Sequence, residues 1–264
     1  MGIQDGMNQC DFEIDSFLMM GQSNMAGRGN IGEVPKIENP LCFMLRMGRW
    51  QGMSEPINPD RCIFSTSPYR SGISLAASFA DEYANCYQKK IGLIPCADGG
   101  TRLEQWMPRE VLYDHAVMMT SLARRTSSLA GILWHQGESD CEPECFPTYA
   151  ARCTHVLESL RRDLGAPEVP LILGGLGEYL ANNLHDAFKN YVHINAQLQQ
   201  MAKTLPCCGY AGAEGLASNP DNLHFSAKAL REFGLRYYRE FQRLCPELGE
   251  GVDADLSVSE IEKL

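Results

Sequence analysis

Four short clusters in this 264-residue sequence carry residue types suited to acyl transfer. They occupy residues 21–27, 98–101, 135–140 and 221–224. Ser23 is a candidate nucleophile, which is weak until a base takes its proton. His224 is the candidate base, since histidine is the side chain best suited to general-base catalysis near neutral pH. Asp221, three residues earlier, can orient the imidazole, so the three residues predict a Ser-His-Asp triad.

A serine nucleophile also needs hydrogen-bond donors for the oxyanion that forms on attack. The predicted donors are the Ser23 main-chain N–H, a main-chain N–H of Gly99 or Gly100, and the side-chain amide of Gln136. Glycine is suitable because the missing Cβ lets the main chain come close to a ligand. Other candidates for site support or substrate contact are Gln22, Asn24, Glu138, Trp106 and Arg28.

Each of these features also has a purely structural explanation. Ser23 could be a helix N-cap, Gly99 and Gly100 a tight turn, and residues 219–222 a turn of their own. Glu138 could brace loops through a hydrogen bond or take a direct part in the site, and Trp106 could pack in the core or form an aromatic floor under a sugar. The co-occurrence of all four clusters favours the catalytic interpretation.

Signatures of competing hydrolases and cofactor proteins are absent from the sequence. It contains no Gly-x-Ser-x-Gly elbow of an α/β-hydrolase, no His-Glu-x-x-His zinc helix and no phosphate-binding P-loop. Cys141 and Cys145 are four residues apart, but no second pair or histidine cluster completes a zinc site. We therefore expect an enzyme without a metal or cofactor.

The elements that must position these clusters alternate along the chain. Apolar runs at 16–20, 91–96, 131–134 and 170–173 predict strands, and apolar stripes of helical period beginning at Leu75, Tyr149, Tyr191 and Leu230 predict helices. This alternation is typical of a parallel sheet with helices on both faces. In such sheets, ligands bind beyond the C-terminal ends of the strands, where three of the clusters stand. Residues 30–70 show no period and are predicted to form a functional loop.

Composition limits the partners. Hydrophobic residues make up 44% and the net charge is −10, so the chain can bury a core but has the wrong sign for nucleic acid or an anionic membrane. No apolar stretch reaches the ~20 residues of a bilayer-spanning helix. Residues 1–245 are predicted to form one domain, and the acid-rich residues 246–264 a mobile tail. Eleven cysteines and no visible signal peptide predict reduced thiols and a cytoplasmic location; the oligomeric state has no readable signal.

The motifs, in order and spacing, resemble those of the SGNH (GDSL-like) hydrolases. They are Gly-Gln-Ser-Asn-Met-Ala-Gly at 21–27, Gly-Gly-Thr at 99–101 followed by Trp106, Trp-His-Gln-Gly-Glu-Ser-Asp at 134–140, and Asp221-x-x-His224. The branch with acetylxylan esterases and the sialate O-acetylesterase domain is the most similar. The resemblance implies a three-layer α/β/α, flavodoxin-like fold with a mainly parallel sheet, and a carbohydrate O-deacetylase.

Residue by residue, the resemblance makes Ser23 the nucleophile, His224 and Asp221 its partners, and the glycine pair with Gln136 the oxyanion hole. The wider superfamily has an asparagine where this sequence has Gln136. The expected enzyme is an acetylxylan-esterase-like serine esterase that removes short acyl groups, mainly acetyl, from a sugar or oligosaccharide. The alternatives left open are a sialate O-acetylesterase, a short-chain lipid or thioester hydrolase on the same scaffold, and a non-catalytic carbohydrate-binding relative.

Overall fold

A seven-stranded sheet forms the centre of the molecule. The computed structural model describes residues 14–59 and 70–248. The strands lie in the order β3-β2-β4-β1-β5-β6-β7, and every neighbouring pair is parallel except β2 and β3. Their bounds are β1 Ile14–Gly21, β2 Cys42–Arg46, β3 Arg49–Gly52, β4 Lys90–Pro95, β5 Ser128–His135, β6 Leu171–Gly174 and β7 Cys208–Ala211.

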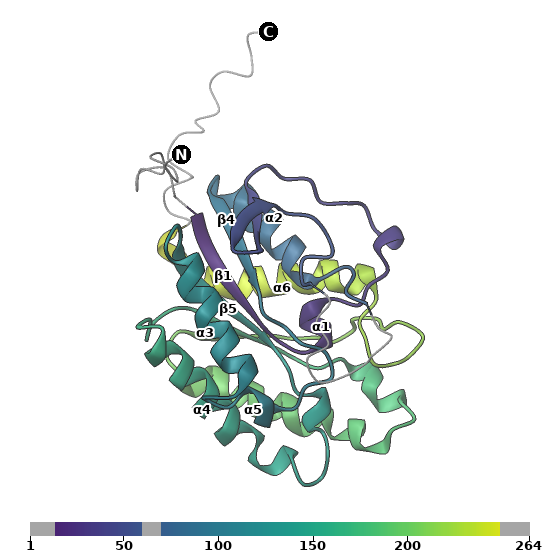
Figure 1. Ribbon diagram of the computed structural model, residues 1–264. Helices are drawn as coiled ribbons and strands as arrows, with labels where there is room; N and C mark the ends of the chain where they lie inside the picture. Colours follow the sequence, from purple (N-terminus) through teal and green to yellow (C-terminus); the bar gives the residue numbers. More distant parts are fainter. Residues whose placement is uncertain (1–13, 60–69, 249–264) are drawn as a thin grey trace, which may run out of the picture.

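Helices cover both faces of this sheet (Figure 1). On one face α2 (Leu75–Tyr87) packs against α6 (Ala227–Leu244). The other face carries α3 (Val111–Ala123), α4 (Tyr149–Asp163) and α5 (Tyr191–Thr204). A four-residue helix, α1 (Ser23–Ala26), directly follows β1. The predicted three-layer α/β/α fold with a mainly parallel sheet is therefore confirmed.

Aromatic packing fixes the central strand β1 against the α2–α6 layer. Phe17 of β1 is fully buried and meets Phe79 of α2 and Phe241 of α6 edge-to-face, with ring centroids 4.9 and 5.2 Å apart. Tyr83 adds a third such contact with Phe17 at 5.2 Å. Each pair of this kind contributes about 0.5–1.5 kcal/mol beyond the area it buries. The strand that leads to Ser23 is thus held rigidly.

The four predicted strands and the helices predicted from the four apolar stripes are all present, but residues 30–70 are not simply a loop. They contain β2 and β3, which form a hairpin through Met47 and Gly48, both with positive φ. This hairpin adds two strands to one edge of the sheet. Residues 60–69 of the predicted loop, and 249–264 of the predicted tail, lie outside the described residues. At the start of that tail, Pro246–Leu248 forms a short 3-10 helix.

The cysteines behave as small apolar residues. The nine cysteines within the described ranges are thiols outside any disulfide, and six of them are buried. Burial, with a smaller contribution from Asp81, raises the pKa of the Cys42 thiol to about 12, so this thiol is neutral at physiological pH. In the described part of the chain, no helix is long and apolar enough to cross a membrane.

Candidate active site

Ser23 lies where the chain leaves the middle of the sheet. Gly21 ends β1 with φ +127°, and a Cβ on it would lie only 1.9 Å from the carbonyl oxygen of His135 on β5. The next residue, Gln22, donates its main-chain N–H to that same carbonyl at 2.9 Å. Ser23 then begins α1 beyond the C-terminal end of β1 and is 7% exposed. Because β1 lies between β4 and β5, loops from three strands surround this serine.

Asp221 and His224 form a tight turn on the segment between β7 and α6. Asp221 Oδ1 accepts the main-chain N–H groups of Leu223 and His224, both at 3.0 Å. Its other oxygen, Oδ2, accepts the Nδ1 proton of the His224 imidazole at 2.7 Å. Asn222 has φ +48°, a left-handed conformation that asparagine tolerates better than most residues. The three-residue spacing thus lets one carboxylate hold both the turn and the ring.

These contacts set the charge and tautomer of the pair. Partial burial on its own would raise the pKa of the Asp221 carboxyl, but hydrogen bonds from His224 and Leu223 lower this pKa below its usual value. The carboxylate is therefore ionised near neutral pH and keeps the proton on His224 Nδ1. The other ring nitrogen, Nε2, is then the one that can take a proton, as a general base must.

One pocket brings the predicted nucleophile, base and glycines together. It has a volume of about 180 Å³. The residues that line it are Gln22, Ser23, Arg28, Gly99, Gly100, Glu138, Ser139, Phe188, Leu223 and His224. A Cβ on Gly99 would lie 3.6 Å from Ser23 Cβ and 2.6 Å from Arg28 Nη2, so a side chain there would crowd the pocket. Gly100 has φ +73°, which favours glycine.

A second, larger pocket adjoins the first through Arg28 and His224. Its volume is about 590 Å³, and Arg70 and Asp221 also line it. The site therefore has a small compartment at Ser23 and a larger one beside the Asp221–His224 pair.

Gln136 is not brought into either pocket. Its side chain is fully buried. Its Nε2 donates to Asp140 Oδ2 at 2.6 Å and to the carbonyl of Thr101 at 3.2 Å. This differs from the expected role as third oxyanion donor, because the amide hydrogens are already used inside the protein. Asp140 also accepts the main-chain N–H of Leu103 at 2.7 Å, so Gln136 joins a network that braces the loops after β4 and β5.

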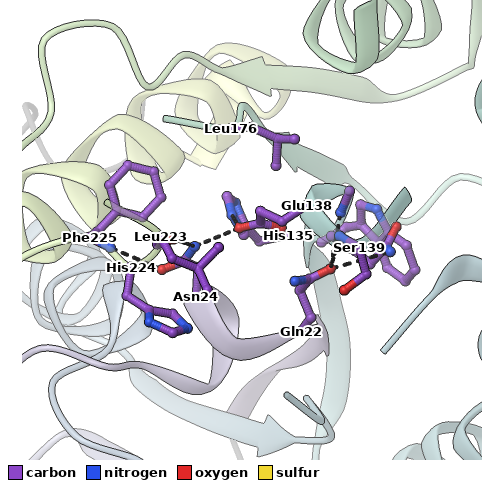
Figure 2. Close-up of polar contacts among 12 residues, drawn as sticks. Gln22, Asn24, His135, Glu138, Ser139, Leu176, Leu223, His224 and Phe225 are labelled. Atoms are coloured by element: carbon purple, nitrogen blue, oxygen red, sulfur yellow. Dashed lines mark hydrogen bonds and ion pairs between the residues drawn. The ribbon is translucent and has the colours of Figure 1, made fainter. Parts of the chain in front are cut away.

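Gln22, predicted only as site support, lines the small pocket that Gln136 does not reach. Its Oε1 faces three N–H donors, on Gln136, Gly137 and Ser139, each 3.4 Å away. Figure 2 shows these contacts on the oxygen side of the amide and the nitrogen on the other side. Within residues 14–59 and 70–248, Gln22 Nε2 has no hydrogen-bond partner, while the side chain lines the pocket. The amide is thus oriented so that its donor end is left for the pocket.

The remaining candidates divide between support and contact. Trp106 is fully buried, packs edge-to-face on Trp134, and donates its Nε1 proton to Thr101 Oγ1 at 3.0 Å. The aromatic floor under a sugar is therefore wrong for Trp106, which instead braces the loop of the glycine pair. Arg28 lines both pockets and donates to the carbonyl of Gly27 at 2.9 Å.

Glu138 and Asn24 are hydrogen-bonded to each other next to the site. Asn24 is fully buried, and its Nδ2 donates to Glu138 Oε1 at 2.5 Å (Figure 2). Burial alone would raise the pKa of the Glu138 carboxyl, but the neighbouring His135 imidazole and the Asn24 hydrogen bond lower it below its usual value. Glu138 is therefore a buried carboxylate that links α1, through Asn24, to the end of β5, through His135, and also borders the pocket.

Two contributors to the site have no signal in the sequence motifs. Phe188 lies in a short 3-10 helix, Asp186–Asn190, and lines the small pocket. Asn183 donates its side-chain N–H to the carbonyls of Asp221 and Asn222 at 3.2 and 3.1 Å. Phe188 is an isolated aromatic residue in a polar segment, and this is the sequence feature from which a substrate contact could have been predicted. Among the described residues no group of three or more His, Cys, Asp or Glu could hold a metal ion.

Comparison with known proteins identifies the family of this chain. The family model described as "Carbohydrate esterase, sialic acid-specific acetylesterase" matches residues 13–243. The chain belongs to this family. This carbohydrate esterase is 30% identical over 242 residues to a probable carbohydrate esterase of Arabidopsis thaliana, covering 83% of this chain and 86% of the relative. The resemblance drawn from the four motifs is thus confirmed at the level of a carbohydrate acetylesterase family.

Solved structures show the same fold. An X-ray structure of that Arabidopsis protein superposes on the carbohydrate esterase with a TM-score of 0.75 at 24% identity, covering 88% of this chain and 98% of the other. NanS gives a TM-score of 0.70 at 17% identity, covering 89% and 98%. A carbohydrate acetylesterase from Xanthomonas citri gives 0.60 at 17% identity, covering 90% of this chain and 57% of that one.

Proposed function

We propose that this carbohydrate esterase is a serine O-acetylesterase that removes acetyl groups from sugar hydroxyls. Ser23 is the nucleophile, His224 the general base, and Asp221 the residue that orients the imidazole. The observation that carries the proposal is the 2.7 Å bond between Asp221 Oδ2 and His224 Nδ1, on an imidazole that lines one pocket with Ser23 and two glycines.

The proposed reaction has two halves. Ser23 Oγ attacks the acetyl carbonyl carbon while its proton passes to His224 Nε2. The same proton then goes to the sugar oxygen as the C–O bond breaks, which leaves an acetyl ester on Ser23. Water attacks this ester, gives its proton to His224, and releases acetate as Ser23 recovers its hydrogen. Asp221 stays ionised throughout.

Three donors are proposed for the oxyanion. Two are the main-chain N–H of Ser23 and the main-chain N–H of Gly99 or Gly100. The third is Gln22 Nε2, in place of Gln136, because Gln22 lines the pocket and Gln136 is bonded elsewhere. A donor of this kind acts mainly in the transition state, and removing one typically lowers kcat by about 10²–10³.

Pocket size supports a short acyl group. Sites for drug-sized ligands span roughly 300–1,000 Å³, whereas the compartment at Ser23 has only about 180 Å³. This size suits acetyl and disfavours the long acyl chain of a lipid substrate. The adjoining compartment of about 590 Å³ is in the range for a sugar.

Two acetylated sugars are candidates. An acetylxylan-type substrate follows from the motif resemblance. A sialate is the second candidate, supported by the family description and by Arg28 and Arg70, which line the larger compartment and could pair with a sugar carboxylate. The cytoplasmic location stays a prediction.

Acetate release tests the proposal. Purified enzyme is incubated with acetylated xylo-oligosaccharides and O-acetylated sialic acids, and with p-nitrophenyl acetate, butyrate and octanoate. We expect acetate from one sugar class and a steep fall in rate with acyl length. Faster turnover of octanoate than acetate would refute the acetyl preference, and no turnover of any ester would refute an enzyme.

A further inference from the structure

The side chain of Asn24 forms hydrogen bonds with the main chain on both sides of His224. Its Oδ1 accepts the N–H of Phe225 at 3.1 Å, and its Nδ2 donates to the carbonyl of Leu223 at 3.2 Å. Leu223 and Phe225 are the residues directly before and after His224 (Figure 2). Asn24 is itself the residue directly after Ser23 on α1. One carboxamide therefore ties the helix of the nucleophile to the turn of the base.

A buried carboxylate holds that carboxamide in one orientation. Glu138 is 2% exposed, and its Oε1 accepts from Asn24 Nδ2 at 2.5 Å and lies 3.2 Å from His135 Nε2. A carboxylate accepts hydrogen bonds but cannot donate them. Its position thus forces the NH₂ end of Asn24 toward Glu138 and Leu223, and the oxygen toward Phe225. A bond to an ionised acceptor is also stronger than a neutral one.

The other main-chain contacts of the turn do not give this link to α1. Asp221 bonds to the main chain and ring of His224 from the same turn, and Asn219 donates its N–H to the His224 carbonyl at 2.7 Å. Asn183 holds the turn at Asp221 and Asn222, from a segment that follows β6. Asn219 also donates its side-chain N–H to the carbonyl of Arg28 at 3.0 Å, two residues beyond α1, and Tyr179 donates its hydroxyl proton to the Leu223 carbonyl at 3.4 Å. The bonds that reach α1 itself are those of Asn24.

We propose that Asn24 is a positioning residue that sets the imidazole of His224 relative to Ser23, with Glu138 as the group that orients Asn24. This inference rests on the proposed function, since it assumes that His224 is the base. Transfer of a proton from Ser23 requires close approach, and a misplacement of about 1 Å can lower a rate by about 10².

The test compares Asn24→Ala with a matched asparagine elsewhere. Asn195 makes the same pair of bonds to Leu176, accepting its N–H at 2.7 Å and donating to its carbonyl at 2.9 Å. We expect Asn24→Ala to lower kcat for p-nitrophenyl acetate by about 10–100-fold with KM changed less than about threefold. Asn195→Ala loses the equivalent bonds and is expected to keep kcat per folded molecule.

A double-mutant cycle with His224→Ala shows whether the effect passes through the base. If Asn24 only positions His224, then adding Asn24→Ala to His224→Ala leaves the residual rate unchanged. A further fall by the same factor as in the wild-type background would overturn the proposal. So would an Asn24→Ala enzyme that folds and keeps full kcat. An active His224→Ala enzyme would instead refute the proposed function.

Glu138→Gln provides a second variant in case Asn24→Ala does not fold. Its amide oxygen can still accept from Asn24 Nδ2, but without the charge. We expect kcat to fall by about 3–10-fold in the wild-type background and not at all in the His224→Ala background. The rate at which a fluorophosphonate labels Ser23 should fall by the same factor. Unchanged kcat and labelling in Glu138→Gln would contradict the role of Glu138.

Discussion

Replacing Gln136 and Gln22 one at a time distinguishes a residue that stabilises the fold from one that takes part in catalysis. Gln136→Ala removes a hydrogen bond to the carboxylate of Asp140, at 2.6 Å, and one to the carbonyl of Thr101, at 3.2 Å. A bond to a charged group contributes about 1.5–3 kcal/mol and a neutral one about 0.5–1.5 kcal/mol. We therefore expect unfolding to require about 2–4 kcal/mol less free energy, which lowers Tm by about 4–16 °C for a domain of this size.

The same variant should retain its activity. Gln22 Oε1 keeps two main-chain donors, Gly137 and Ser139, so kcat per folded Gln136→Ala molecule should fall by less than about tenfold. Gln22→Ala should behave in the opposite way. Its lost contacts are long, 3.4 Å each, so Tm should change little, while kcat falls by about 10²–10³ with KM nearly constant.

Both variants are measured by thermal unfolding and by p-nitrophenyl acetate turnover at the same active-site concentration. A Gln136→Ala protein with unchanged Tm and a 100-fold lower kcat would return the oxyanion role to Gln136. A fully active Gln22→Ala enzyme would exclude Gln22 from the oxyanion hole.

Four further outcomes are expected. Ser23→Ala should fold with wild-type Tm and lose at least about 10³ in kcat, and labelling of Ser139 instead of Ser23 by a fluorophosphonate would contradict the nucleophile. Gly99→Ala should raise KM and lower kcat, because its Cβ would lie 2.6 Å from the Arg28 side chain. Wild-type KM and kcat in this variant would show that the ester does not bind beside Gly99. EDTA should leave turnover unchanged, whereas loss of activity rescued by a divalent metal would reveal an overlooked ligand set. The lowered pKa of Asp221 gives stability that is present above about pH 4 and is lost as pH falls further. The Asp221→Asn protein should therefore lose less stability than the wild type between pH 5 and pH 3, and its kcat at neutral pH should be about 10⁴-fold lower. An acid unfolding profile identical to that of the wild type would contradict this linkage.

The central strands could be predicted because both faces of the sheet are buried. Continuous apolar runs such as the one in β1 are typical of such strands. The edge strands are different. In β3 the side chains of Arg49 and Gln51 are exposed, and β7 contains Gly209, so neither shows an apolar run. Strand β2 is partly buried, but its apolar run is short and lies between segments rich in glycine, proline and asparagine. For this reason the sequence does not predict it as a strand.

The Asp221-x-x-His224 motif predicted a local geometry, because both residues lie within one turn and three residues separate them. The positions of Gln136 and Gln22 could not be predicted in this way. Both follow a strand end and both carry a carboxamide, and which one faces the pocket depends on Asp140, whose carboxylate captures the Gln136 amide. That contact is tertiary, so the spacing of residues in the sequence does not predict it.

The most direct test of the central claim is the mass of the enzyme during turnover. Wild-type protein is mixed with its best acetylated sugar, quenched in acid within milliseconds, digested and analysed by mass spectrometry. The proposed mechanism predicts one acetyl group on the peptide that contains Ser23, absent from Ser23→Ala and accumulating in a variant whose deacylation is slowed. Acetate release at the full rate from a Ser23→Ala enzyme, with no acetylated peptide, would contradict the mechanism.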